Sequence, residues 1–250
     1  IAYLGYDDEL RSYQQNNVYL MASDGGGARN LTVNYDRSVD NIAWRSDGKA
    51  LIGQVEDEGI LTLVSIDLSG NVRTLVEDIG GTSLGRPYAA GSFSVASNAG
   101  GSSPIIAYTK GSTNRPAEVA ISRGGRDGRQ LTRLNDDALG HLDLARIEEI
   151  KISSSHDGRE IEAGVALPPN FRPDGSFPMI LEIHGGPATM YGPYFSAEIQ
   201  RYAAQGYVTV YANPRGSTGY GEDFAQLIDL NYPGNDHDDL MSVVDALIAK

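Results

Sequence analysis

Two glycine-bearing turns, each directly after an apolar run, are the parts of this 250-residue sequence best suited to chemistry. The run MILEIH ends in His184-Gly185-Gly186-Pro187, and the run YVTVYAN leads into NPRGSTGYGEDF at 213–224. Glycine has no Cβ, so the N–H groups of Gly185 and Gly186 could come close to a ligand. Such donors stabilise the oxyanion of acyl transfer, and one is worth roughly 3–4 kcal/mol of barrier. A tight turn without a chemical role is the alternative for this motif taken alone.

The other reactive side chains are less suited to catalysis. Arg215, in the second motif, is expected to hold its own loop through several donors rather than to bind substrate. A G-x-S-x-G string occurs at 81–85, but a nucleophile elbow needs a buried strand before the serine and a helix after it. Pro87 follows instead, so this string is not predicted to carry a nucleophile.

The histidines and acidic clusters give no metal or cofactor site. We expect His141 in a linker, His156 in a hairpin turn and His237 in the solvated start of a helix, while His184 shapes the glycine turn. Three aspartates are interpreted as charges facing a helix dipole rather than as metal ligands: Asp236, Asp238 and Asp239. The acids at 56–58 are interpreted as solvated loop residues, with a role in attracting a peptide amino terminus as the alternative.

The elements that must position these residues fall into two groups, and the first, at 1–147, consists of short strands separated by turns. Three units end in a strand, a glycine-bearing turn and a second strand with Arg-x-Leu. The aligned residues Leu31, Leu75 and Leu131 stand 44 and then 56 residues apart, near the period of a four-stranded propeller blade. The first unit lacks its inner strand. A β-sandwich with similar hairpins is the alternative.

The second group, at 148–250, mixes strands and helices. A hairpin turning at Asp157-Gly158 precedes two buried strands, at 179–184 and 207–213. Helical spacing follows each buried strand, at 194–206 and at 235–250. Alternating strands and helices indicate the start of an α/β sheet, whose ligands bind at the carboxyl ends of the strands.

Four motifs in this order resemble the peptidase domain of the prolyl oligopeptidase family: IHGGP, AEIQRYAAQGY, NPRGSTGYGEDF and NDHDDLMSVVDALIAK. The acylaminoacyl peptidase branch is the most similar, because other branches carry a tyrosine where this sequence has His184. The resemblance is strong over 148–250 and weaker over 1–147. It implies the C-terminal blades of a β-propeller at 1–147, followed by the N-terminal part of an α/β-hydrolase domain at 148–250.

The resemblance also implies a serine peptidase that cleaves short peptides, N-acylated ones among them, through an acyl-enzyme. In that family the nucleophile follows the helix at 235–250, and the catalytic Asp and His come later. The chain would then supply the oxyanion residues His184, Gly185 and Gly186 and the loop-positioning Arg215, but none of the triad. The remainder of the same polypeptide would be its partner. An esterase of the same fold and a non-catalytic, propeller-containing binding protein are the alternatives.

Composition limits the remaining possibilities. A net charge of −13 without a large basic cluster argues against nucleic acid and against anionic membrane surfaces. The sequence has no cysteine and no run of 18 apolar residues, so we expect neither disulfides nor a transmembrane helix. Both ends look cut, which indicates a piece of a longer protein and leaves cytoplasm and periplasm open. A homo-oligomer is compatible with the sequence.

Overall fold

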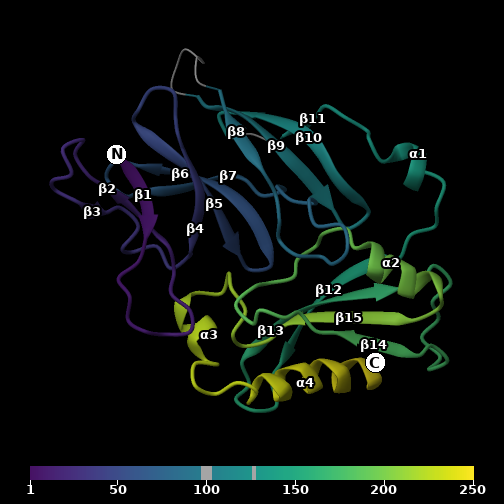
Figure 1. Ribbon diagram of the computed structural model, residues 1–250. Helices are drawn as coiled ribbons and strands as arrows, with labels where there is room; N and C mark the ends of the chain where they lie inside the picture. The colour runs from purple at the N-terminus through teal and green to yellow at the C-terminus, as the bar shows by residue number, and fades with distance from the viewer. Residues whose placement is uncertain (97–102, 126–127) are drawn as a thin grey trace.

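The computed structural model describes residues 1–96, 103–125 and 128–250, and it is mostly β-structure in four open sheets (Figure 1). Three antiparallel sheets follow one another along the chain, and the fourth sheet is mixed. Figure 1 shows the first three sheets, purple to teal, in the upper part of the molecule, and the fourth sheet with its helices, green to yellow, below them.

Each antiparallel sheet joins strands in their sequence order, β1-β2-β3, β4-β5-β6-β7 and β8-β9-β10-β11. The strands at the predicted positions are confirmed, and the first sheet has three strands where the others have four. Ser97 and residues 126–127, in the predicted third unit, lie outside the described residues. The strands are β1 Ala2–Gly5, β2 Asn17–Leu20, β3 Arg29–Asn30, β4 Val39–Trp44, β5 Ala50–Asp57, β6 Ile60–Asp67, β7 Val72–Val76, β8 Phe93–Val95, β9 Ile105–Ser112, β10 Arg115–Arg123 and β11 Arg129–Gln130.

The three aligned leucines do not occupy equivalent positions. Leu31 and Leu75 are both 5% exposed and belong to core clusters, whereas Leu131 is 49% exposed. The backbone does not explain this difference, because β3 and β11 each pair over two residues and the N–H groups of Leu31 and Leu131 each donate to the preceding strand at 2.7 Å. The difference lies in the side chains around each leucine. The repeat in the sequence therefore predicts a common strand pattern better than a common core.

The fourth sheet has the strand order β12-β13-β15-β14. The predicted hairpin is confirmed as β12 (Arg146–Ser153) and β13 (Glu160–Leu167), and Gly158 adopts φ +75° in its turn. The two predicted buried strands are β14 (Met179–Glu182) and β15 (Val208–Asn213), which pair in parallel. The carboxyl ends of these two strands therefore meet at one edge of the sheet.

Helices cover both faces of this sheet. α2 (Ala197–Ala204) packs Ile199 and Ala203 beside Ala166 of β13, whereas α4 (Asp236–Ile248) packs Leu240 and Val243 into the cluster on the other face. Alternate residues of β13 point to opposite faces, as the pleat requires. The two predicted helices are confirmed, with the stop of α2 at Gly206, where φ is +87°. Two short helices complete the fold: α1 Asp136–Leu139 and α3 Glu222–Gln226.

The antiparallel part of the chain contacts the fourth sheet and its helices at several places, and at two of them main-chain groups bond to each other. The segment after β7 lies against the start of α2, where the N–H of Ala197 donates to the carbonyl of Leu84 at 2.9 Å. The β5–β6 turn lies against the loop after β15, where the N–H of Glu58 donates to the carbonyl of Gly219 at 2.9 Å. The two parts of the chain are thus joined by main-chain hydrogen bonds as well as by side chains.

Candidate active site

The glycine turn leaves the sheet earlier than predicted, because β14 ends at Glu182 rather than at His184. Gly185 and Gly186 are exposed, and their N–H groups donate no hydrogen bond to any residue that the structure describes. A Cβ at Gly185 would meet no atom within 4 Å. Gly186 differs, because it has φ +139° and a Cβ there would lie 3.2 Å from the nitrogen of Ala188.

His184 is buried beside these glycines, with 6% of its surface exposed. Its Nε2 lies 3.0 Å from Oγ of Ser217, and that hydroxyl donates its single proton to the carbonyl of Pro214 at 2.7 Å. Nε2 must therefore donate, which fixes the neutral tautomer with its proton on Nε2. Burial lowers the pKa of His184 below its ordinary 6.5, in agreement with a neutral ring. His184 thus holds the turn and is not placed as a proton shuttle.

The two sequence motifs come together at this edge of the sheet. Besides the contact between His184 and Ser217, the N–H of Thr218 donates to the carbonyl of Thr189 at 3.0 Å. The side chain of Asn213 binds both the N–H and the carbonyl of Tyr191, each at 2.8 Å. The loop after β15 is therefore a scaffold for the glycine turn after β14.

A buried carboxylate below the turn was not anticipated from the sequence. Glu182, the last residue of β14, is 8% exposed; its Oε1 accepts a hydrogen bond from the hydroxyl of Tyr191 at 3.1 Å and forms an ion pair with Nη1 of Arg86 at 3.0 Å. The sequence did contain a sign of this buried carboxylate, since Glu182 is the one acidic residue in the apolar run MILEIH. Without the fold, however, neither partner could be identified.

Arg215 points away from the glycine turn, toward α4. Its Nη2 and Nε lie 2.7 and 2.9 Å from the carboxylate of Asp239, its own N–H donates to the same carboxylate, and Asp157 lies 3.2 Å from Nη2. The side chains of Arg215 and Asp239 are 3% and 0% exposed. Asp239 lies in the first turn of α4, as predicted for a charge facing the helix dipole, and it is also the buried ion-pair partner of Arg215.

The remaining candidates lie elsewhere. Ser83, of the G-x-S-x-G string, sits in a segment without helix or strand and donates to the carbonyl of Arg86 at 2.7 Å. His141 is exposed, His156 contacts the side chain of Asn235, and the side chain of His237 is 73% exposed.

Within the described ranges no three His, Asp or Glu side chains gather as metal ligands. None of the helices there is long and apolar enough to cross a membrane.

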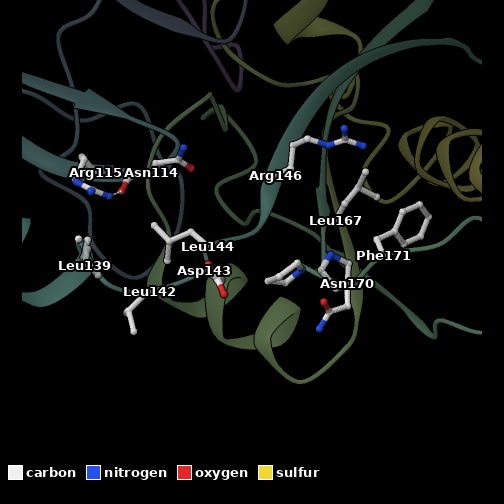
Figure 2. Close-up of a pocket in the computed structure, with 13 residues that line it drawn as sticks. Asn114, Arg115, Leu139, Leu142, Asp143, Leu144, Arg146, Leu167, Asn170 and Phe171 are labelled. Carbon is white, nitrogen blue, oxygen red and sulfur yellow. Dashed lines mark hydrogen bonds between the residues drawn. The ribbon is translucent and has the colours of Figure 1, made fainter.

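A groove of about 740 Å³ lies apart from the glycine turn (Figure 2). It is lined by the β9–β10 turn with Asn114 and Arg115, by the linker at 139–144, and by Leu167 to Phe171 after β13. Neither sequence motif lines it. The candidate site is thus the exposed edge at the ends of β14 and β15, and not this groove.

The chain is thus a mostly β protein whose last, mixed sheet has exposed glycines directly after its parallel strand β14. Residues 193–250 match the family model described as the prolyl oligopeptidase family. These residues therefore match the family that the motifs resemble. The chain is 38% identical over 146 residues, 58% of its length, to the uncharacterized peptidase YuxL of Bacillus subtilis, and 28% identical over 97% of its length to dipeptidyl-peptidase 5 of Arthroderma otae.

Solved structures agree with this assignment. The Pyrococcus horikoshii acylaminoacyl peptidase is 26% identical, with a TM-score of 0.78 over 99% of this chain and 36% of its own. The chain spans 22% of the length of the Bacillus relative and 33% of the Arthroderma relative. The similarity therefore concerns a part of each of these longer proteins.

Proposed function

We propose that this chain is part of a serine peptidase that cleaves short peptides, N-acylated ones included, through an acyl-enzyme. Residues 1–147 would form the last blades of a β-propeller, and 148–250 the first part of an α/β-hydrolase domain. Three successive sheets with strands in sequence order support the first assignment. The mixed sheet with helices on both faces supports the second.

One observation carries the proposal: Gly185 and Gly186 are exposed just after β14, and their amides have no acceptor among the residues that the structure describes. In acyl transfer, a serine oxygen bonds to the substrate carbonyl carbon, and negative charge develops on the carbonyl oxygen. The serine proton passes to the leaving amine through a general base. The serine and the base would come from the remainder of the polypeptide, while the glycine amides would donate to the oxyanion.

The structure makes Gly185 a cleaner test than Gly186. A side chain at Gly185 projects into open space, so Gly185→Val should leave folding intact while crowding the oxygen that the amide would bind. At Gly186 the positive φ would add strain and confuse the result. Gly85 is the matched control, because it is also exposed, lacks a positive φ and has no atom within 4 Å of a built Cβ.

The experiment measures peptide turnover and serine-directed fluorophosphonate labelling in the full-length protein that contains this chain. We expect Gly185→Val to lower kcat by about 10²-fold with an unchanged Tm, and Gly85→Val to match the wild type. Wild-type kcat in Gly185→Val would rule out the oxyanion role. Turnover of esters without any turnover of peptides would favour an esterase, and absence of a labelled serine would favour a binding protein.

A further inference from the structure

A three-residue strip, Ser217 to Gly219, lies between the glycine turn and the second antiparallel sheet. On one side, the N–H of Thr218 donates to the carbonyl of Thr189, in the chain that continues from the glycine turn. On the other side, the carbonyl of Gly219 accepts from the N–H of Glu58, in the β5–β6 turn. A Cβ at Gly219 would lie 2.7 Å from Sδ of Met190, so only glycine fits between the two neighbours.

One side-chain hydrogen bond connects this strip to β5. The hydroxyl of Thr218 donates to Oε2 of Glu56, and Thr218 is 6% exposed. Glu56 was interpreted from the sequence as a solvated loop acid, which is wrong, because it lies within β5 against this strip. Burial raises the pKa of Glu56, although the hydrogen bond from Thr218 opposes the shift and thereby favours the carboxylate.

The next residue of the strip holds the glycine turn. Ser217 is fully buried, and its Oγ accepts from Nε2 of His184, which directly precedes Gly185 in the chain. A continuous path of contacts therefore runs from Glu56 through Thr218 and Ser217 to His184 and the Gly185 amide. Among the described residues of the antiparallel sheets, no other side chain forms a hydrogen bond with Ser217 or Thr218.

We propose that Glu56 is a positioning residue: through Thr218 it fixes the strip at 217–219, so that Ser217 orients His184 and the amide of Gly185 points at the substrate oxygen. The inference rests on the proposed function and adds a role for the antiparallel part of the chain. A misplacement of about 1 Å at a catalytic group can cost roughly 10²-fold in rate. The loss should fall on kcat, because the amide acts on the transition state more than on bound substrate.

The test uses four variants of the full-length protein with a peptide substrate: Glu56→Ala, Thr218→Val, their double mutant, and Thr218→Ser. We expect each of the first two to lower kcat by about tenfold with KM within about twofold, and the double mutant to be no worse than either. Thr218→Ser keeps the hydroxyl and should recover most of the loss. Glu160→Ala, at an acid whose side chain is 64% exposed, is the control and should match the wild type.

Three results would overturn the inference. Wild-type kcat in Thr218→Val, which is nearly isosteric, together with a loss in Gly185→Val, would refute the role of Glu56 and leave the proposed function standing. Losses that multiply in the double mutant would show that the two residues act independently. Wild-type kcat in Gly185→Val would refute the proposed function itself, and the inference would fall with it. Where Glu56→Ala lowers Tm below the assay temperature, Thr218→Val decides.

Discussion

At the scale of single residues, the charged groups near the glycine turn are used mainly for support. Arg215 and Asp239 form an ion pair that water hardly reaches, and Asp157 gives the guanidinium a second partner. Burial of such a pair costs desolvation, and removal of one partner leaves the other charge uncompensated. The arrangement holds the loop after β15 to α4, and this loop in turn carries Ser217.

We predict that Arg215→Met destabilises the protein by about 3–5 kcal/mol, because it leaves the carboxylate of Asp239 buried without a partner. Chemical denaturation of the full-length protein measures the change. Arg172→Met is the matched control, since that side chain is 78% exposed and 3.8 Å from Asp174, and we expect a cost of about 0–1 kcal/mol. Equal costs for the two variants would contradict the structural role of Arg215.

At the scale of elements, the two long helices begin in different ways. The side chain of Ser196 caps α2, accepting from the N–H of Ile199 at 3.1 Å, and its hydroxyl donates to the carbonyl of Gly85 at 2.7 Å. Asn235, at the start of α4, makes no capping bond with its side chain. The start of α2 is therefore fixed both by its own cap and by the segment before β8.

Ser196→Ala should cost about 1–2 kcal/mol of stability, because it removes the cap and also leaves the carbonyl of Gly85 without this donor. For Asn235→Ala we expect a change within about 0.5 kcal/mol, since the hydrogen-bond partner of its side chain among the described residues is the exposed His156. Thermal unfolding of both variants provides the comparison. A larger effect at Asn235 than at Ser196 would show that these contacts do not govern the two helix starts.

At the scale of the whole molecule, acidic groups meet where the β5–β6 turn contacts the fourth sheet. Glu162 of β13 faces Glu149 and Lys151 of β12, Glu58 of the turn, and the hydroxyl of Tyr220. Gly59 in this turn has φ +79°, which favours glycine, and a side chain there would lie against the carboxylate of Glu162. Burial, with a smaller contribution from Glu149, raises the pKa of Glu162 to about 6.

Because Glu162 is buried where the β5–β6 turn contacts the fourth sheet, we predict that the stability of the protein depends on pH. The pKa of Glu162 is about 6 in the folded state, above the ordinary 4.5, so the folded protein binds this proton more tightly than the unfolded chain does. The free energy of unfolding therefore falls as pH rises from about 4.5 to about 6. Glu162→Gln removes the free-energy cost of ionising this buried carboxylate, so we expect it to raise Tm at pH 8 and to match the wild type near pH 4. A mutant that is less stable than the wild type at pH 8 would refute the assignment.

Much of the fold could be predicted because it depends on local patterns. The strands before residue 147, the hairpin at Asp157-Gly158, the pair β14 and β15, and the stops of the helices all follow from apolar periodicity and turn residues. Glu56 was misread, because a carboxylate in a sequence reads as solvated, and only the fold brings the partner Thr218 that meets it at the end of β5.

The sequence by itself determined that glycine amides would follow a strand and that a second glycine-rich loop would follow the next strand, because strand periodicity and the lack of a Cβ are properties of the local chain. The groups that support those amides from other segments became known from the fold. Ser217 contacts His184 across 33 residues, and Glu56 contacts Thr218 across 162 residues. Such contacts depend on the pairing and stacking of whole sheets, which no local pattern specifies.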